Sequence, residues 1–358
     1  MRTPPCLVRP RSLVSQAVET TQRWTGGQYS LLRSVLGAVT VVYALGIAAT
    51  GYAFLSVATL AASCAVLVGS RDRVAALVAA VFVLAGPDQP GWGALETMAL
   101  GIALLLHAGT PPAPFGSWAA IGRTAPAGQW EMPQQVRIAT WAAIAGMWML
   151  RGLGEIGSAA WPLAVLEIAA PLLFATRQFR ALAWTALLGV LVGNSVLGQA
   201  QWGLLILHMM AFEPAWLAPV GSDDPPDVVF YDGSCALCHG IVRFVLAEDP
   251  APGRLRFAPL AGESFAKFGP HTAASTPDAI AVSEAGAATL LWRSDAVIRV
   301  CNRLGGVWRV VAFGLSLLPR WLRDAGYDVI ASRRKSLFGS TTQACPLISP
   351  ALRSRIET

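Results

Sequence analysis

Two cysteines separated by two residues, Cys235 and Cys238, are the side chains whose spacing points most directly to chemistry. They follow Asp232-Gly233 at the end of a short apolar run, 228–231. On the first turn of a helix this spacing brings two sulfurs within disulfide reach, and the helix N-terminus favours the thiolate form. We therefore expect a thiol-disulfide redox centre. Cys235, nearer the helix end and more exposed, would be the attacking thiolate, and Cys238 would resolve the mixed disulfide.

Two other interpretations of the same cysteines remain open. With His239 they also spell Cys-x-x-Cys-His, the attachment motif of c-type haem, although no methionine follows Met210 to act as an axial ligand in this region. A zinc site would need more ligands from His239, His271 and Cys345, and the sequence has no second Cys-x-x-Cys. Cys345 is also a candidate third redox thiol.

The residues around the pair predict a small α/β domain of alternating elements. Apolar periodicity and turn residues predict strand 228–231, a helix from Cys235 to about Ala247, a strand at Leu255–Phe257, a helix at Gly262–Phe268, strands Ala279–Ser283 and Thr289–Trp292, and a helix capped by Ser294 that ends at Gly305-Gly306. This order is the plan of a thioredoxin-like fold. Such folds place a cis-proline against the redox pair, and Pro277 is the candidate, with an ordinary trans proline as the alternative. Cys301 is expected to be a buried core thiol.

The chain as a whole is unusually apolar, since 54% of its 358 residues are hydrophobic and only 13% are charged. A composition of this kind predicts an α-helical transmembrane bundle of about eight spans. The expected spans are Leu31–Tyr52, Ala53–Gly69, Val74–Gly86, Trp92–Ala108, Ile138–Leu150, Ala159–Thr176, Ala181–Leu197 and Trp202–Leu217. Val74–Gly86 and Ile138–Leu150 are short for a helix that crosses a bilayer.

The distribution of charged residues predicts the domain boundaries of the chain and its orientation in a membrane. Basic residues occupy every second loop between the expected spans, which predicts an integral protein of the cell inner membrane with the N-terminus and the C-terminal domain in the cytoplasm. The expected parts are a cytoplasmic segment 1–30, a transmembrane helical domain 31–217, a linker 218–227, a thioredoxin-like domain 228–305, and a helical extension and tail 306–358.

Ionisable residues inside apolar spans are costly to bury and therefore mark candidate sites. Glu96 and His107 lie near span ends, where a structural or interfacial role is the simpler interpretation. Glu167 and His208 form a candidate membrane site, and for Glu167 a bracing role and a functional role are equally open. A lipid-soluble quinone is a candidate electron acceptor for such a site. The sequence implies no other cofactor.

The formal net charge of +6 raises the question of an anionic partner. Basic and apolar residues interleave near the C-terminus at Arg320, Trp321, Leu322, Arg323, Tyr327, Ile330, Arg333, Arg334 and Lys335. This pattern favours an interfacial helix attracted to anionic membrane lipid over a nucleic-acid partner.

The segment carrying the cysteines resembles the DCC family of predicted thiol-disulfide oxidoreductases, whose signature Asp-Gly-x-Cys-x-x-Cys appears here as Asp232, Gly233, Cys235 and Cys238. The likeness extends to about residue 345 through Arg293-Ser294-Asp295-Ala296, Leu304-Gly305-Gly306, Pro319-Arg320, Leu322-Arg323-Asp324, Tyr327, Ala331, Arg334, Phe338-Gly339 and Cys345, and it departs from the family near 335–337. The first half looks similar to DoxX-like helical domains through Pro114-Phe115-Gly116-Ser117, Met132-Pro133 and Phe212-Glu213-Pro214-Ala215-Trp216. The resemblance implies a redox module fused to a helical bundle.

Two functions from different classes follow. The first is an oxidoreductase that exchanges electrons with an unknown thiol or disulfide protein partner, and through the helical half with a membrane acceptor. The second is a membrane transporter or assembly factor whose thioredoxin-like domain binds a partner or a soft metal without redox turnover. A reactive Cys235 distinguishes them, because a binding module needs no activated thiolate.

Overall fold

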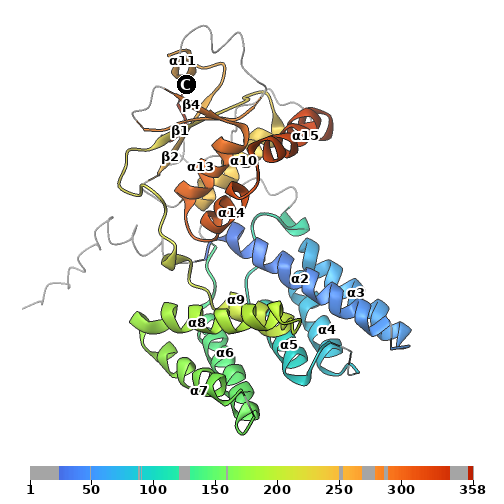
Figure 1. Cartoon of the computed structure of the whole chain (residues 1–358). Coiled ribbons are helices and arrows are strands. Elements are labelled where there is room, and N and C mark those ends of the chain that lie inside the picture. Colours follow the sequence, from blue (N-terminus) through green and yellow to red (C-terminus); the bar gives the residue numbers. More distant parts are fainter. Residues whose placement is uncertain are drawn as a thin grey trace, which may run out of the picture. The chain divides into compact units, whose positions relative to one another are not determined.

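The chain folds as two compact units, which are described separately (Figure 1). The computed structural model describes residues 24–48, 50–87, 89, 91–120, 130–158, 160–249, 253–267, 279–285, 289–338 and 354–357. Among these, Trp24 to Phe212 form the helical unit, and Glu213 onward form the C-terminal unit.

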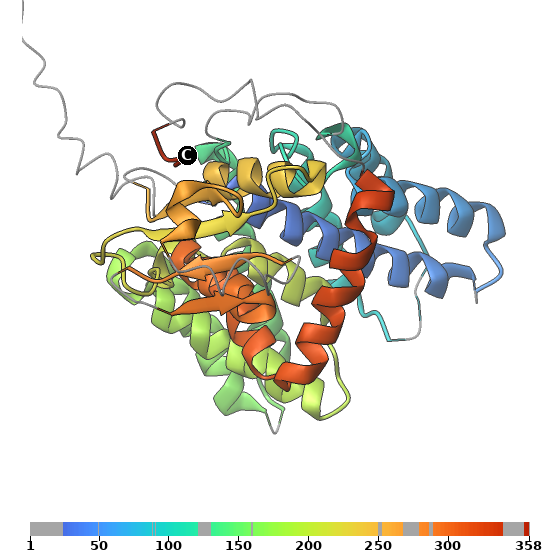
Figure 2. The same cartoon turned by 90° about the horizontal axis from the view of Figure 1, so that it is seen from above.

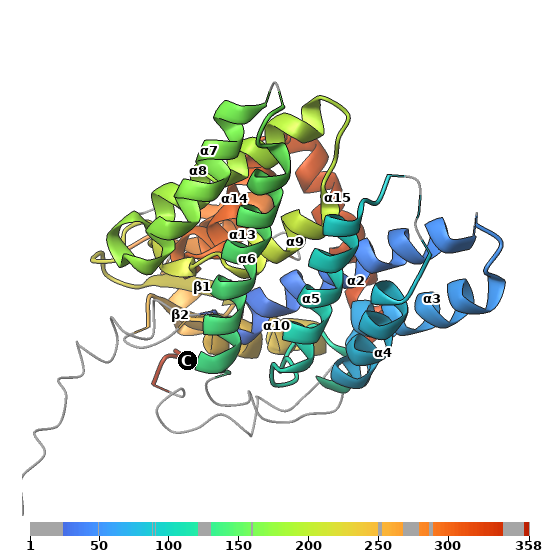
Figure 3. The same cartoon turned by 90° about the horizontal axis from the view of Figure 1, so that it is seen from below.

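The helical unit contains a helix at each of the eight apolar segments. The elements are α2 (Gly26–Ala48), α3 (Ala53–Val68), α4 (Asp72–Leu84), α5 (Ala94–Ala108), η1 (Trp118–Ala120), α6 (Gln134–Glu155), α7 (Trp161–Ala169), η2 (Ala170–Ala175), α8 (Arg177–Val196) and α9 (Trp202–Met210). Helices α2 and α3 lie side by side, followed by α4 and α5, and α5 also packs on α9 (Figure 3).

The prediction of about eight membrane spans is wrong, because only α2 and α8 among the described helices are long and apolar enough to cross a membrane. Core helices of water-soluble proteins and signal sequences also meet these criteria of length and composition. Turns divide the apolar stretch, with Gly51 and Gly69 at positive φ, and leave α3 with 16 residues. A helix of that length rises only about 24 Å, less than the ~30 Å hydrocarbon core. The inner-membrane assignment and the orientation relied on eight crossings and lose that support.

The C-terminal unit is built on a small mixed sheet with strand order β2-β1-β3-β4. Strands β1 (Asp227–Tyr231) and β2 (Leu255–Pro259) are parallel, and β3 (Ala281–Ser283) is antiparallel to β1 and to β4 (Leu290–Trp292). Its helices are η3 (Pro214–Trp216), α10 (Ala236–Glu248), α11 (Glu263–Ala266), α13 (Arg293–Leu304), α14 (Val307–Ser316) and α15 (Arg320–Phe338). The predicted order of strands and helices is therefore confirmed.

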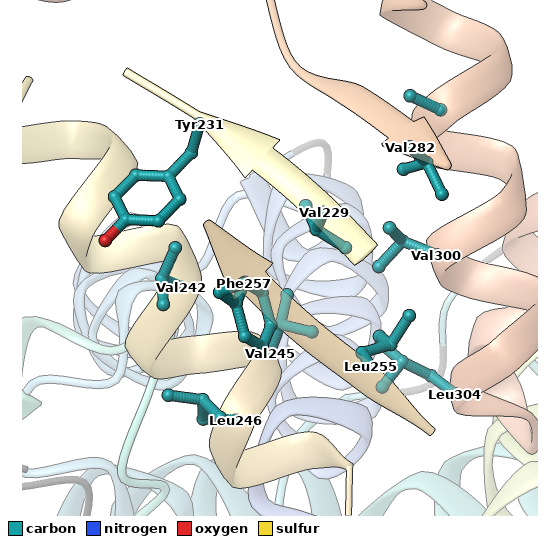
Figure 4. Close-up of a cluster of buried hydrophobic side chains, with 11 residues drawn as sticks. Val229, Tyr231, Val242, Val245, Leu246, Leu255, Phe257, Val282, Val300 and Leu304 are labelled. Atoms are coloured by element: carbon teal, nitrogen blue, oxygen red, sulfur yellow. The ribbon is translucent and has the colours of Figure 1, made fainter. Parts of the chain in front are cut away.

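Strand β1 is buried on both faces of the sheet, as its continuous apolar run predicts. Val229 and Tyr231 face a core with Val242 and Val245 of α10, and Val300 of α13 packs into the same cluster (Figure 4). A second cluster consists of Phe230, Ala258, Phe265 and Ala281. Helix α11 therefore belongs to this cluster, whereas α10 and α13 belong to the first one. Alternate residues of one strand thereby join both layers of helices to the sheet.

The start of α13 differs from the prediction. Its N-cap is Trp292, and Ser294 lies in the first turn, where its backbone N–H and hydroxyl both donate to a carboxylate oxygen of Asp324. Asp324 belongs to α15, so the cap comes from a helix that is distant in sequence. The end of α13 is as predicted, with Gly305 and Gly306 both at positive φ.

The last described residues extend the sheet at its β2 edge. Ile356 pairs in parallel with Phe257: the Phe257 N–H donates to the Arg355 carbonyl at 2.9 Å, and the Glu357 N–H donates to the Phe257 carbonyl at 2.7 Å. Arg355 also forms an ion pair with the buried carboxylate of Asp249. Residues 355–357 are thus fixed to the domain by backbone and side-chain contacts.

Candidate functional site

The cysteine pair lies where β1 passes into α10. Cys235 is the N-cap residue of α10, with extended backbone at φ −98° and ψ 120°, and Cys238 lies within its first turn. Among the residues that the structure describes, no side chain caps the free N–H groups at this helix end. Both cysteines are free thiols. The backbone therefore places Cys235 at the position from which N-cap side chains meet unpaired N–H groups.

The turn between β1 and Cys235 is held by its own hydrogen bonds. One carboxylate oxygen of Asp232 accepts from the Ser234 N–H at 2.9 Å and from the Ser234 hydroxyl at 2.7 Å, and the Cys235 N–H donates to the Asp232 carbonyl at 3.2 Å. His239 Nε2 donates to the Gly233 carbonyl at 2.8 Å. This bond gives His239 a structural role in the turn.

The two thiols differ in exposure, and in the opposite sense to the prediction. Cys235 is 0% exposed, whereas Cys238 is half-buried. The expectation that Cys235 is the more exposed thiol is therefore wrong. Position on a helix fixes which backbone groups a residue meets, but exposure depends on the packing of segments that are distant in sequence.

Burial and the neighbouring thiol disfavour ionisation of Cys238. Desolvation, followed by the hydrogen bond with Cys235 and the charge of its thiolate, raises the pKa of Cys238 to about 12. The positive charge of Arg334 acts in the opposite direction on this pKa, and Asp232 adds to the rise. Cys238 is therefore protonated at neutral pH. This state is compatible with a thiol that attacks only after the mixed disulfide has formed.

Arg334 joins the site from α15, 102 residues beyond Asp232. Its Nη2 lies 3.1 Å from the second carboxylate oxygen of Asp232, and both side chains are largely buried. Sequence reasoning placed Arg334 on a membrane-facing helix and missed this role. The alternation of basic and apolar residues carries no signal that would have shown which basic side chain turns inward.

Other predicted site residues lie elsewhere. Pro277, Cys345 and His271 fall outside the described residues. Within the described ranges, no group of three or more His, Cys, Asp or Glu side chains is arranged to hold a metal ion. Cys301 is buried as predicted, and desolvation raises the pKa of its thiol to about 11.

The candidate membrane residues are both fully buried in the helical unit. Glu167 lies 3.3 Å from Nε of Arg151, and neither of its carboxylate oxygens has a hydrogen-bond partner in the part of the chain that the structure describes. His208 Nε2 lies 2.9 Å from the Trp184 carbonyl, and its ring stacks on that of Trp184 at 4.8 Å. The two residues thus have separate partners, and their roles stay predictions.

Comparison with known proteins identifies the C-terminal unit. A family model described as DCC1-like thiol-disulfide oxidoreductase matches residues 229–340. The chain is 32% identical over 133 residues to "Uncharacterized protein YuxK" of Bacillus subtilis. The aligned region covers 37% of this chain and 93% of that relative. The chain belongs to the DCC1-like thiol-disulfide oxidoreductase family. It is also 27% identical over 125 residues to "DCC family protein At1g52590, chloroplastic" of Arabidopsis thaliana, covering 35% of this chain and 72% of the relative.

The DCC1-like match contains the whole turn, both cysteines and all of α15, including Arg334. It covers no part of the helical unit, so the expected DoxX-like resemblance is not supported. No solved structure matches the chain.

Proposed function

We propose that the C-terminal unit is a thioredoxin-like thiol-disulfide oxidoreductase in which Cys235 is the nucleophile and Cys238 the resolving thiol. The observation that carries the proposal is the position of Cys235 as the uncapped N-cap of α10. A thiolate there accepts hydrogen bonds from free N–H groups and lies at the positive end of the helix dipole. The family match supports the same chemistry.

The exchange proceeds in two steps. The Cys235 thiolate attacks one sulfur of a partner disulfide, which forms a mixed disulfide and releases the first partner thiol. Cys238 then loses its proton and attacks the sulfur of Cys235, which closes the intramolecular disulfide and releases the second partner thiol. The partner gains two electrons and two protons, and the cysteine pair loses them. The reverse sequence oxidises a dithiol partner.

Arg334 and Asp232 are positioning residues in this scheme. Their ion pair fixes the turn that carries Cys235, and the charge of Arg334 favours the Cys238 thiolate needed in the second step. Since Cys235 is fully buried, the first step also requires the surrounding segments to part when a partner docks.

A small aromatic disulfide, 5,5′-dithiobis(2-nitrobenzoic acid), tests the assignment in a chain whose Cys6, Cys64 and Cys345 are replaced by serine. The reduced parent should release two thionitrobenzoate ions per cysteine pair and retain no label. Cys238→Ser should release one ion and keep the other group on residue 235.

Cys301→Ser, which removes a buried core thiol, is the matched control and should behave as the parent does. If Cys238→Ser retains no label while Cys235→Ser does, the roles of the two thiols are reversed. If neither cysteine reacts in the folded chain, the binding-module alternative replaces the redox function.

We further propose that the helical unit anchors this domain to a membrane. The support is that α2 and α8 have the length and apolar composition of spanning helices. Electron transfer to a quinone, with Glu167 and His208 as the buried groups involved, stays a prediction. Carbonate extraction of cell membranes tests the anchor, because a chain without spanning helices would be released into the supernatant.

A further inference from the structure

Arg151 of α6 gathers polar side chains from neighbouring segments of the helical unit. Its Nη2 lies 3.2 Å and its Nε 3.4 Å from one carboxylate oxygen of Glu155, and its Nη1 donates to the side-chain oxygen of Gln201. The amide oxygen of Asn194, when turned toward the guanidinium, accepts from Nη2 at 2.8 Å and from Nη1 at 3.2 Å. These acceptors engage all five N–H groups of the guanidinium.

Glu167 of α7 lies against the same guanidinium but gains no hydrogen bond from it. One of its oxygens is 3.3 Å from Nε of Arg151, and the side chain is 0% exposed. Both oxygens of Glu167 and the second oxygen of Glu155 lack a hydrogen-bond partner in the described parts of the chain. Two carboxylates thus face one guanidinium, and a buried carboxylate without donors is unstable in its charged form.

The packing of two helices fixes Glu167 in this position. Helices α6 and α7, green in Figure 2 and Figure 3, lie side by side within the helical unit. A Cβ on Gly152 would lie 2.8 Å from Cγ1 of Ile168 and 3.1 Å from Cβ of Glu167, so a glycine is needed where the two helices meet. Glu155 is the last residue of α6, and its side chain is 28% exposed. Because both carboxylates approach the same nitrogen of Arg151, the buried one has a partly exposed one beside it.

Other groups near the pair do not supply the missing positive charge. Glu96 of α5 accepts the Gly203 N–H at 2.8 Å and the Leu204 N–H at 3.1 Å. Element η2, which also packs on α7, contains no titratable residue. Within the described ranges, no group of three or more His, Cys, Asp or Glu side chains is arranged to hold a metal ion, which favours a proton over a metal ion at this position. A proton supplies both a positive charge and an O–H donor.

We propose that Glu167 and Glu155 form a proton-exchange site, in which Glu167 holds one proton and Glu155 passes it to and from water. On uptake, a proton from water binds the Glu155 carboxylate and moves to Glu167, which becomes a neutral carboxylic acid while Glu155 stays paired with Arg151. Release reverses these steps. No electron is transferred, and the charge of the cluster changes by one. This inference concerns the helical unit and does not depend on the redox assignment.

Infrared spectroscopy of the full chain in detergent tests the site, because the C=O stretch of a protonated carboxyl is separate from the bands of carboxylates. Spectra are recorded at pH 7, where exposed Asp and Glu side chains are ionised, and again in deuterium oxide. The variants are Glu167→Gln and Glu155→Gln. The matched control is Glu96→Gln, which replaces a buried carboxylate of the same unit that has two backbone donors.

Glu167→Gln should remove acid intensity equal to one carboxyl per chain. Glu155→Gln should remove the same intensity, because a single carboxylate facing Arg151 is neutralised without a proton, whereas Glu96→Gln should leave the intensity unchanged. In the parent, the acid band should shift to lower frequency in deuterium oxide, since Glu155 connects Glu167 with water. If Glu167→Gln fails to fold, as judged by size-exclusion chromatography, Glu155→Gln carries the test because it keeps Glu167 in place.

Four results would overturn the proposal. An acid band that survives in Glu167→Gln, or that is lost in Glu96→Gln, assigns the proton to another group. A band that survives in Glu155→Gln shows that the second carboxylate does not create the site. A band that does not shift in deuterium oxide identifies a locked, structural proton that is not exchanged with water.

Discussion

Replacing each cysteine of the pair separately should show that the two thiols alkylate at different rates, with Cys238 the slower of the two. In Cys235→Ser, the hydrogen bond and charge from residue 235 are lost, but desolvation, the largest cause of the raised pKa of Cys238, remains. A rise from the ordinary value near 9 to about 12 lowers the thiolate fraction at pH 7 about 1000-fold. A more basic thiolate is a better nucleophile, with a Brønsted slope near 0.45, which offsets roughly 20- to 30-fold of that loss. Cys238 should therefore alkylate up to roughly 30- to 50-fold more slowly than an exposed thiol.

The assay is the rate of iodoacetamide reaction from pH 6 to 11, followed by mass spectrometry in a chain without Cys6, Cys64 and Cys345. Restricted access of the reagent lowers the rate of a thiol by the same factor at each pH, whereas a raised pKa changes the shape of the profile. The rate for Cys238 should still be rising at pH 10. Cys235, measured in Cys238→Ser, should alkylate faster than Cys238 at pH 7, because its side chain lies at the free N–H groups of α10.

Two results would refute this reasoning. If the Cys238 profile levels off below pH 9, desolvation does not control its ionisation. If Cys235 alkylates no faster than Cys238 at pH 7, the helix end does not activate it, and the nucleophile must be reassigned.

Three further substitutions test the contacts that build the domain. Arg334→Met should raise the pKa of Cys238 further, because it removes a positive charge that favours the thiolate, and should slow disulfide closure roughly three-fold at pH 7. Quenched-flow trapping measures this rate, and Arg333→Met on the exposed side of the same helix should leave it unchanged. Asp324→Ala should lower the free energy of unfolding by about 1 kcal/mol at pH 7. Although desolvation opposes the shift, hydrogen bonds from Ser294 and nearby arginines lower the pKa of Asp324, so this stabilisation is present above the unfolded pKa and is lost as acid protonates the carboxylate. A difference between parent and variant that persists unchanged at pH 3 in chemical denaturation would contradict it. Arg355→Met should cost about 2 kcal/mol, because it leaves a buried carboxylate with fewer partners, and an unchanged thermal midpoint would show that the C-terminal contact adds no stability.

The order of elements in the C-terminal unit could be predicted because it is encoded locally. An uninterrupted apolar run predicted β1, three- and four-residue periodicity predicted α10, and paired glycines predicted the end of α13. The cysteine pair was equally visible, since its spacing and its place at a helix start are properties of a few neighbouring residues. These features need no knowledge of what packs against them.

Hydropathy over the first half predicted where helices form but not how many could cross a membrane. Each apolar segment does contain a helix, yet turns at positions such as Gly51 and Gly69 decide their lengths. Composition averaged over a window does not register where a helix ends, so the count of eight spans exceeded the two that helix length and apolar composition together allow.

Only the tertiary structure decided how the site is built. The burial of Cys235, the cap that Asp324 gives to α13 and the contact of Arg334 with Asp232 all join residues far apart in the chain or depend on packing. The same holds for α15, whose sequence shows basic and apolar residues interleaved but not which of them face inward. Local patterns set the conformation of a segment, whereas the partner of each side chain is set by which segments the fold brings together, and that information is spread over the whole chain.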